Sequence, residues 1–409
     1  MNTNERENSV ILTVITGFSI FTMLFGAGNF MVPPKLGILA GQKSLLASAG
    51  FIITAVVLPI IGLVGSFLFE GDYRAFFFRI GKLPGSLLIA LCMFISGPGL
   101  VLPRIVNICF EMIHPFIPSM TLLVFAVLMA IVTFLLAYRP TKLIDTLGYL
   151  ITPVKLSLIV ILIIMGLAFG DSMIQTDISD IDLVGKSMLF GYETLDLLAI
   201  IFLGSAILDI FKKSFEPEIA GDMKRMIKRG VISSLIGGFV LVPVYISMTF
   251  LGAYYGAGLE NLNHAQVLSG ISFRIMGSSG GFFAAIALIV ACLATMIALS
   301  TIVGEYIQKE IMRDRVGFIP SLIFILVSTI IISLFGLSKL MIFSRDLGFV
   351  LYPVIITLTL CNVAYKLFGF KLVKLPVLVV FLMTIFFQFE GIDHCRKLVS
   401  KRESVERIE

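Results

Sequence analysis

Long apolar stretches alternate with short polar segments along the whole chain. A membrane-spanning helix needs roughly 20 mainly apolar residues, and eleven stretches approach or exceed this length. They cover residues 10–32, 44–69, 85–112, 117–137, 149–169, 188–211, 230–256, 280–304, 317–337, 341–364 and 372–389. The last contains Lys374 and Pro376, so a partial, re-entrant or interfacial segment is an alternative there. The pattern predicts an all-α polytopic membrane protein whose connecting segments are too short to fold as a catalytic domain.

The composition supports this interpretation. Hydrophobic residues make up 58% of the chain and charged residues only 14%, whereas soluble domains are about 45–50% apolar and about 25% charged. Such sparse charge excludes a soluble enzyme and a disordered regulator. No basic tract with interleaved aromatic residues is present, so no nucleic acid partner is expected. The expected surroundings are the lipid bilayer.

Lys and Arg are concentrated in alternate connecting segments, above all in residues 212–229. By the positive-inside rule, this pattern predicts a multi-pass protein of the cell inner (cytoplasmic) membrane with a cytoplasmic N-terminus. One feature disagrees, because eleven spans would leave the basic tail Arg396–Arg407 outside. Either the last stretch does not span, or the tail is a tolerated exception.

The first apolar stretch is interrupted by glycines near its middle. It reads Phe25-Gly26-Ala27-Gly28-Asn29, and Pro33-Pro34 follow. Glycine is a poor helix former and proline lacks a backbone donor, so the helix is expected to break here. Backbone freed inside the membrane must line a cavity or bind a ligand. A plain kink or a packing seam of small residues is the alternative.

The sixth stretch carries Glu193, Thr194 and Asp196 where the sequence is otherwise apolar. The run Leu197–Phe211 is too short to span alone, so Thr194 and Asp196 are expected at membrane depth, where ionisable groups indicate function. The two interrupted stretches begin five spans apart and therefore run in opposite directions. Paired breaks of this kind are typical of transporters built from inverted repeats. We expect one transporter domain, 1–409, with repeats 10–169 and 188–364 and an extra C-terminal segment, 372–409.

Several motifs, taken in order, resemble those of the branched-chain amino acid transporters of the bacterial LIV–cation symporter family. They are Phe25–Pro34, Gly97-Pro98 with Pro103-Arg104 and Phe110-Glu111, Leu143–Gly148, Pro153–Lys155, Gly191–Asp196, and Ala291–Thr295 with Gly304-Glu305. The resemblance covers about residues 10–370. It implies a LeuT-like fold with a 5+5 inverted repeat and broken helices 1 and 6. The family usually has twelve spans, and this chain is expected to lack the last one.

The resemblance also implies the function and its site residues. The function is import of leucine, isoleucine or valine coupled to Na⁺ by alternating access. Implied substrate-binding residues are Gly26, Ala27, Gly28, Asn29, Glu193, Thr194 and Asp196. Implied Na⁺ ligands are Thr22, Phe25, Asn29, Ala291 and Thr295. A hydroxyl bonded to its own helix is the alternative for Thr295. Candidates for the apolar wall of the substrate pocket are Phe202 and Met93 or Phe94.

Lys155 competes with the Na⁺ interpretation, because its ammonium could lie at the cation position, as in some proton-coupled members of the superfamily. Alternatively it extends to the membrane interface. Arg104 and Glu111, seven residues apart on one face of the third span, are candidates for coupling or gating with other polar groups, or for static charges. No cofactor is expected beyond the coupling ion, Na⁺ or H⁺.

Two other classes of membrane protein compete with a transporter. A channel should show rings of like charge or repeated filter carbonyls. A membrane enzyme needs a nucleophile with its base or a metal-binding motif. Neither pattern is evident in the sequence.

Overall fold

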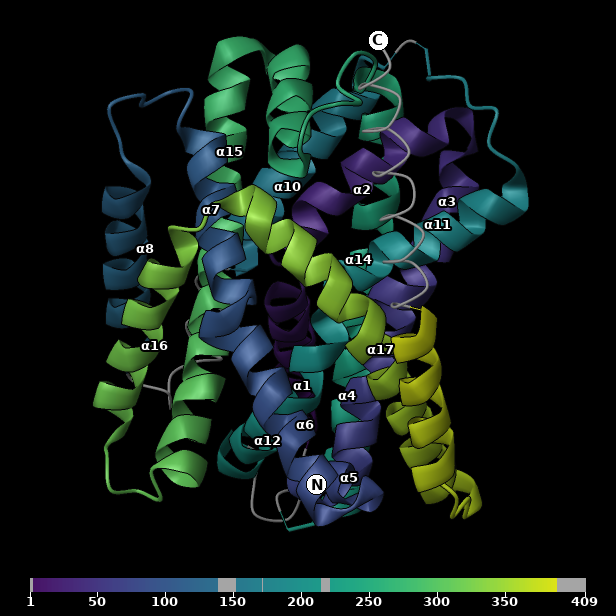
Figure 1. The fold of residues 1–409 in the computed structure, drawn as a ribbon, viewed down its shortest axis with the longest axis vertical. Helices are drawn as coiled ribbons and strands as arrows, with labels where there is room; N and C mark the ends of the chain where they lie inside the picture. Colours follow the sequence, from purple (N-terminus) through teal and green to yellow (C-terminus); the bar gives the residue numbers. More distant parts are fainter. Residues whose placement is uncertain (1–2, 139–151, 171, 215–220, 388–409) are drawn as a thin grey trace, which may run out of the picture.

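The computed structural model describes residues 3–138, 152–170, 172–214 and 221–387. Helices cover most of these residues, and no strand occurs among them (Figure 1). Two features used in the sequence analysis lie outside the described residues: the motif Leu143–Gly148 and the tail Arg396–Arg407.

The first half of the chain contains the helices of the first five apolar stretches. They are α1 (Thr3–Leu24), α2 (Ala27–Ala40), α3 (Ser44–Ile52), α4 (Leu58–Leu68), α6 (Lys82–Phe94), α7 (Val101–Ile113), α8 (Leu122–Ala137) and α10 (Thr152–Ala168). A short helix, α5 (Tyr73–Phe77), lies between α4 and α6. A π-helical turn, Ile53–Val57, joins α3 to α4, and another, Ile95–Gly99, joins α6 to α7. The second turn contains Pro98, which removes a backbone donor and so accounts for the kink.

The second half repeats the alternation of apolar helices and short connections. Its helices are α11 (Asp180–Tyr192), α12 (Asp196–Ser214), α14 (Met223–Tyr255), α15 (His264–Tyr306), α16 (Phe318–Ser333) and α17 (Leu337–Phe368). Gly277 interrupts α15 with φ +69°, which separates the first segment of α15 from the long apolar helix Ser279–Ile311. A last apolar helix, Lys374–Phe387, lies at the edge of the bundle (Figure 1).

The described part of the chain has five helices long and apolar enough to cross a membrane, or six with α11 and α12 taken as one bent span. The remaining predicted stretches hold shorter apolar helices. The helix Lys374–Phe387 would extend roughly 20 Å, less than the ~30 Å of a hydrocarbon core. The number of complete spans therefore stays a prediction.

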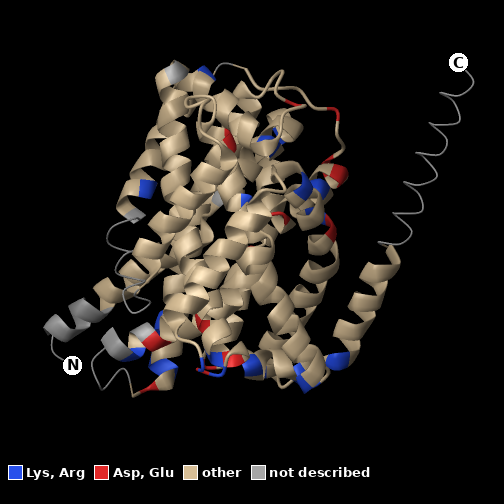
Figure 2. Cartoon of the chain, turned by 60° about the vertical axis from the view of Figure 1, so that its left-hand side comes forward, with Lys and Arg blue, Asp and Glu red and all other residues tan. Residues whose placement is uncertain are grey.

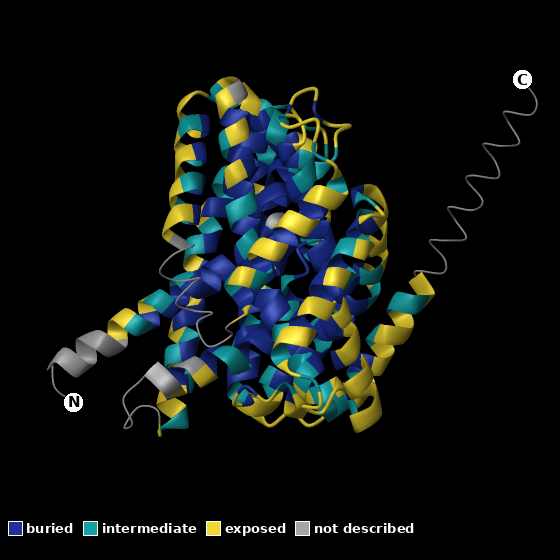
Figure 3. Ribbon diagram, turned by 90° about the vertical axis from the view of Figure 1, so that its left-hand side faces the viewer, coloured by how far each residue is buried: buried dark blue, intermediate teal, exposed yellow. Residues whose placement is uncertain are grey.

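Buried residues lie at the centre of the bundle and exposed residues on its outside (Figure 3), and many of the exposed residues are large and apolar. Leu87, Ile131 and Phe324 are among the exposed examples. Charged residues lie mainly near the two ends of the bundle and are scarce in its middle (Figure 2). This distribution suits a protein whose sides contact lipid and whose ends contact water.

Two groups of helices surround the middle of the bundle. In the first group, α14 packs on α1 and α2, α11 packs on α3, and α12 packs on α4. In the second group, α7, α8, α15 and α16 pack on one another. Helix α2 also contacts α15, so the first group meets the second beside the break between α1 and α2.

Candidate functional site

The predicted break in the first span is confirmed. Helix α1 ends at Leu24 and α2 begins at Ala27, with Phe25 and Gly26 between them. Gly26 is extended (φ −94°, ψ −162°), and its N–H donates to the Leu24 carbonyl over 2.8 Å. The first N–H groups of a helix lack partners within it and carry its positive dipole end. The start of α2, inside the bundle, is therefore suited to a carboxylate.

The predicted break in the sixth span is confirmed as well. Helix α11 ends at Tyr192 and α12 begins at Asp196, with a bend of 48° between their axes. The Thr194 hydroxyl donates to the Gly191 carbonyl over 2.8 Å, at the end of α11. Leu195 has φ +60°, which is unfavourable for a bulky residue without special surroundings. Backbone strain of this kind is concentrated at functional sites.

The two breaks meet through side-chain hydrogen bonds. The Asn29 amide nitrogen lies 2.5 Å from an Asp196 carboxylate oxygen and 2.5 Å from the Tyr245 hydroxyl. Asn29 is 1% exposed and Tyr245 is fully buried. Tyr245 comes from α14, and its ring packs against those of Phe25 and Phe51. Asn29 thus ties α2 to both α12 and α14.

Tyr245 is a site residue that the sequence analysis missed. Its hydroxyl is a polar group within the apolar stretch 230–256, and this feature of the sequence could have marked Tyr245 as a candidate. Tyr352 on α17 is a second case, because its buried hydroxyl accepts the N–H of Leu197 in the first turn of α12.

Arg104 lies between the two breaks. It extends from α7, is 2% exposed, and donates to the Glu193 carbonyl over 2.8 Å and to the Ser344 hydroxyl over 3.0 Å. A Cβ on Gly28 would lie 3.3 Å from its guanidinium and 3.4 Å from the Thr194 Cα. Gly28 therefore allows Arg104, α2 and the second break to approach closely.

Glu111, the other charged candidate on α7, belongs to a different contact. Its carboxylate accepts a hydrogen bond from the Asn263 side chain over 2.5 Å. Asn263 caps the N-terminus of α15. Arg104 and Glu111 therefore each pair with other polar groups, and their gating role stays a prediction.

A small cavity of about 30 Å³ lies where the breaks meet. Both breaks line it, together with apolar side chains; the lining includes Leu24, Gly26, Gly28, Asn29, Arg104, Ile105, Thr194, Asp196, Ala199, Leu203, Thr295 and Leu299. One water molecule needs roughly 10–15 Å³ by this kind of measure. The cavity has room for about two or three waters and must widen before it can hold an amino acid.

The side chains suggested for the apolar wall do not line this cavity. Phe202 instead stacks on Phe77 with ring centres 5.5 Å apart. Met93 is buried elsewhere, and Phe94 is 50% exposed. That expectation was wrong, because the rotation of each helix about its axis is set by packing rather than by composition.

Lys155 occupies a position among the implied Na⁺ ligands. Its side chain is fully buried, so the alternative of extension to the interface is wrong. Its ammonium donates to the carbonyls of Thr22, at 2.9 Å, and Phe25, and it lies 3.5 Å from the carbonyl of Ala291. These carbonyls belong to α1, to the first break and to α15. The lysine thus bridges the two groups of helices.

The other two implied Na⁺ ligands are arranged differently. Asn29 is bonded to Asp196 and Tyr245, as described above. The Thr295 hydroxyl is buried and has no hydrogen-bond partner, so the alternative of a bond to its own helix is wrong. A Cβ on Gly26 would lie 2.9 Å from that hydroxyl. Thr295 thus presents an unused oxygen to the first break.

The arrangement of two broken helices within these packed groups is that of the LeuT-like fold. Mhp1, a nucleobase-cation-symport-1 family transporter, shares the fold with a TM-score of 0.61 and 12% identity, over 93% of each chain. A manganese transporter of Eremococcus coleocola gives a TM-score of 0.61 and 15% identity, over 96% of this chain and 91% of that one.

Sequence comparison shows the family. Residues 9–404 match the family described as "Branched-chain amino acid transport protein". The chain is 30% identical to the branched-chain amino acid permease BraB of Bacillus subtilis, over 87% of this chain and 80% of that protein. It is 28% identical to the permease BrnQ of the same organism, over 90% and 84%. The chain therefore belongs to the branched-chain amino acid transport protein family. It is a multi-pass membrane transporter and not an enzyme.

Proposed function

We propose that the protein imports leucine, isoleucine and valine across the cytoplasmic membrane by alternating access, with its N-terminus in the cytoplasm. The observation that carries this proposal is the meeting of the two helix breaks at Asn29 and Asp196. At this junction, the positive N-terminal end of α2 lies near the Asp196 carboxylate and the negative C-terminal end of α11. One small zwitterion can therefore bind both. The permeases BraB and BrnQ support the substrate class, since both are named for branched-chain amino acids.

The substrate carboxylate binds at the first turn of α2, where the N–H groups of residues 27–29 carry the positive end of the helix dipole. The ammonium binds near Asp196 and the carbonyl end of α11. The aliphatic side chain faces Leu24, Ala199 and Leu203, which line the same cavity. Displacement of the Arg104 side chain from the site would supply part of the missing volume.

We infer that the coupling ion is a proton carried by Lys155. Its ammonium already bonds to the carbonyls of Thr22 and Phe25, which a sodium ion would need as ligands. Two cations cannot share these oxygens without strong repulsion. Protonated Lys155 holds α1 against α15, and loss of the proton releases this bridge between the two groups of helices.

Sodium coupling is the alternative, and Thr295 favours it. The Thr295 hydroxyl is buried beside the first break and has no hydrogen-bond partner. Oxygen ligands suit hard cations, so a sodium ion could bind there if Lys155 moved away. The two candidates therefore differ in whether Lys155 or a sodium ion holds the carbonyls when substrate is bound.

Contacts between the two helix groups at both ends of the bundle support alternating access. At the end with α5, Glu310 accepts a hydrogen bond from the Tyr73 hydroxyl over 3.1 Å and forms an ion pair with Arg74. Toward the other end, Arg104 on α7 donates to the Glu193 carbonyl between α11 and α12. The first set connects α5, which contacts α12 of the first group, to the turn Ile307–Ile311 that follows α15. The second set connects the break between α11 and α12 to α7. Opening toward either side requires one set to separate.

Uptake of radiolabelled leucine into proteoliposomes tests the function and the ion together. The membrane potential is clamped at zero, because one charge moved across 100 mV is worth about 2.3 kcal/mol for either ion. Accumulation driven by an inward proton gradient without sodium supports the proposal, and accumulation driven only by a sodium gradient supports the alternative. Glutamate and protein-free liposomes are the controls. No accumulation under either gradient would refute the proposed function.

A further inference from the structure

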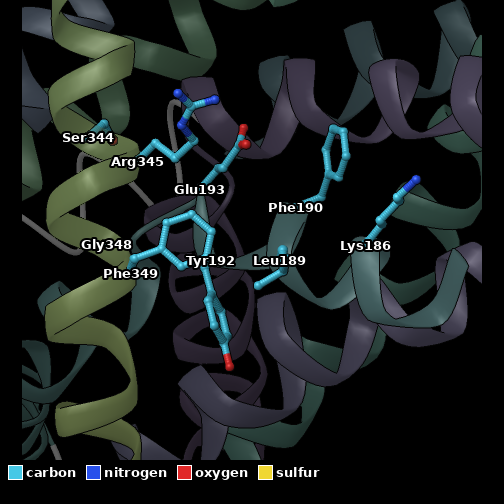
Figure 4. Close-up of a pocket in the computed structure, with 9 residues that line it drawn as sticks. All are labelled: Lys186, Leu189, Phe190, Tyr192, Glu193, Ser344, Arg345, Gly348 and Phe349. Carbon is cyan, nitrogen blue, oxygen red and sulfur yellow. The ribbon is translucent and has the colours of Figure 1, made fainter. Parts of the chain in front are cut away.

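The two ends of α17 differ in the charges around them. Near its beginning, Arg345, Lys186 and Glu193 line one hollow between α11 and α17, so charges of both signs lie there (Figure 4). Toward its other end, the chain from Leu347 to Phe389 contains lysines but no acidic residue. Figure 2 shows basic residues at the foot of the last helix, which follows α17. This second end therefore carries positive charge that its own segment does not neutralise.

The turn that follows α17 is held against the segment that follows α5. Gly369 ends α17 with φ +74°, a conformation that favours glycine. The Arg79 guanidinium lies 3.8 Å from the centre of the Tyr365 ring and donates to the carbonyl of Lys371 over 3.3 Å. Val373 is 4% exposed and anchors the next residues in the core. The backbone that carries the lysines of this turn is therefore fixed by packing.

Four lysines at this end of the bundle are exposed. The basic rim, as we call this group, consists of Lys82, Lys366, Lys371 and Lys374. The ion pairs within 4 Å among the described residues include none of the four. The Lys366 ammonium instead lies 4.6 Å from the centre of the Phe69 ring. Arg79 comes three residues before Lys82 and joins that segment to the turn after α17.

Large apolar side chains are exposed between these lysines. Phe368 is 84% exposed and Leu372 is 62% exposed, and both lie between Lys366 and Lys374 in the chain. Leu83, next to Lys82, is 74% exposed. In a membrane protein such side chains contact acyl chains, whereas a lysine extends its ammonium toward the headgroups. A soluble anion would satisfy the lysines and leave the apolar side chains in water.

We propose that the basic rim binds the phosphate headgroup of an anionic phospholipid, with its acyl chains against Phe368, Leu372 and Leu83. Lysines clustered beside a membrane-spanning helix attract anionic lipids, and basic pockets between spans bind their headgroups. Both parts of such a lipid have a partner here, the phosphate at the lysines and the hydrocarbon at the apolar side chains. The proposal concerns the lipid around the protein and does not depend on the transported substrate or the coupling ion.

Fluorescence quenching of the full-length protein in vesicles tests the proposal. The chain contains no tryptophan, so Phe368→Trp adds a single fluorophore beside the basic rim. The vesicles contain equal amounts of phosphatidylglycerol and phosphatidylcholine, and one lipid or the other carries bromine atoms on its acyl chains. Phosphatidylglycerol is expected to be favoured at least about fivefold at this position, since one lysine near a membrane surface favours anionic lipid by about this factor.

Further variants in the Phe368→Trp protein show whether the lysines cause the preference. Lys371→Gln combined with Lys374→Gln should bring it close to one, and Lys371→Arg combined with Lys374→Arg should keep it. Lys212→Gln combined with Lys309→Gln removes the same number of charges from lysines that already pair with a neighbouring acid, and should leave the preference unchanged. Size-exclusion profiles and melting temperatures establish that each variant is folded.

A second fluorophore position reports on lipid elsewhere around the protein. Phe324 is exposed on α16, on the other side of the bundle from the end of α17 (Figure 1). Phe324→Trp should therefore be quenched equally by the two brominated lipids. An equal preference at both tryptophan positions would overturn the proposal, because it would describe the whole surface rather than the basic rim.

Three other results would also overturn the proposal. The first is equal quenching of Phe368→Trp by the two lipids, and the second is a preference that persists in full without Lys371 and Lys374. The third is loss of the preference in inorganic phosphate but not in chloride of the same ionic strength, which would indicate a site for a free anion. None of these results bears on leucine transport, so the proposed function is tested separately.

Discussion

The ammonium nitrogen of Lys155 lies 2.9 Å from the carbonyl oxygen of Thr22, in the last turn of α1. The last carbonyls of a helix lack partners within it and carry the negative end of its dipole. In a membrane these groups cannot turn to lipid. The break that lines the proposed substrate site therefore also leaves carbonyls that need a positive charge, and in this structure Lys155 supplies it.

Replacement of this charge should uncouple transport. Lys155→Met keeps an unbranched side chain of similar length but cannot donate to the carbonyls of Thr22 and Phe25. We expect proton-driven leucine accumulation to fall at least tenfold, whereas exchange of external for internal leucine, which needs no gradient, persists. Both are measured in proteoliposomes with the potential clamped.

Lys309→Met is the matched control, because Lys309 is exposed and pairs only locally with Glu305. It should leave both assays unchanged. If Lys155→Met still accumulates leucine against a proton gradient, the lysine does not carry the coupling proton.

The Asn29 side chain should contribute to substrate affinity through the Asp196 carboxylate. Asn29→Ala removes the donor that lies 2.5 Å from this carboxylate. Leaving a buried polar group without its partner costs about 1–3 kcal/mol, so leucine affinity at the central site should fall about tenfold or more. Tyr245→Phe keeps the ring contacts with Phe25 and Phe51 and removes only the hydroxyl, so its effect should be smaller. Isothermal titration with leucine measures both, and equal losses would contradict the assignment to Asp196.

The sequence predicted the helix breaks because their signals are local. Glycines at 26 and 28 disrupt helical hydrogen bonding wherever the helix lies, and Asp196 at membrane depth indicates function without any knowledge of its neighbours. The apolar stretches likewise predicted the positions of the helices, because their length is set by the membrane. The family resemblance placed these breaks in a LeuT-like arrangement.

Contacts between distant helices were beyond such local signals. Whether Lys155 reaches the carbonyls of α1 or the membrane interface depends on the rotation of α10, which the sequence left open. Phe202 was misplaced for the same reason.

Small residues between α2 and α14 should be essential for folding. A Cβ on Gly37 would collide with backbone atoms of Thr249 and Ala253. A backbone cannot move aside by rotating about a side-chain bond, so the clash would push the two helices apart. Gly37→Ala should therefore lower the melting temperature of the purified protein markedly or prevent its accumulation. Gly185→Ala is the control, since nothing lies within 4 Å of the added carbon. Equal melting temperatures for the two variants would show that α2 and α14 are not closely packed.

The contact of Glu310 with Tyr73 and Arg74 should keep the end of the bundle near α5 closed. Glu310→Gln removes the ion pair, and since partly exposed pairs are worth up to about 1 kcal/mol, opening toward that side should increase by roughly fivefold.

The readout is the rate at which a polar maleimide modifies Leu203→Cys, introduced into the central cavity. Cys92, Cys109 and Cys292 are buried and Cys361 is partly exposed, so the protein without Leu203→Cys gives the background modification. Glu305→Gln removes the neighbouring local pair with Lys309 and should not change the rate. Tyr73→Phe keeps the ion pair and should give an intermediate rate. A modification rate unchanged in Glu310→Gln would mean that other contacts hold this end closed.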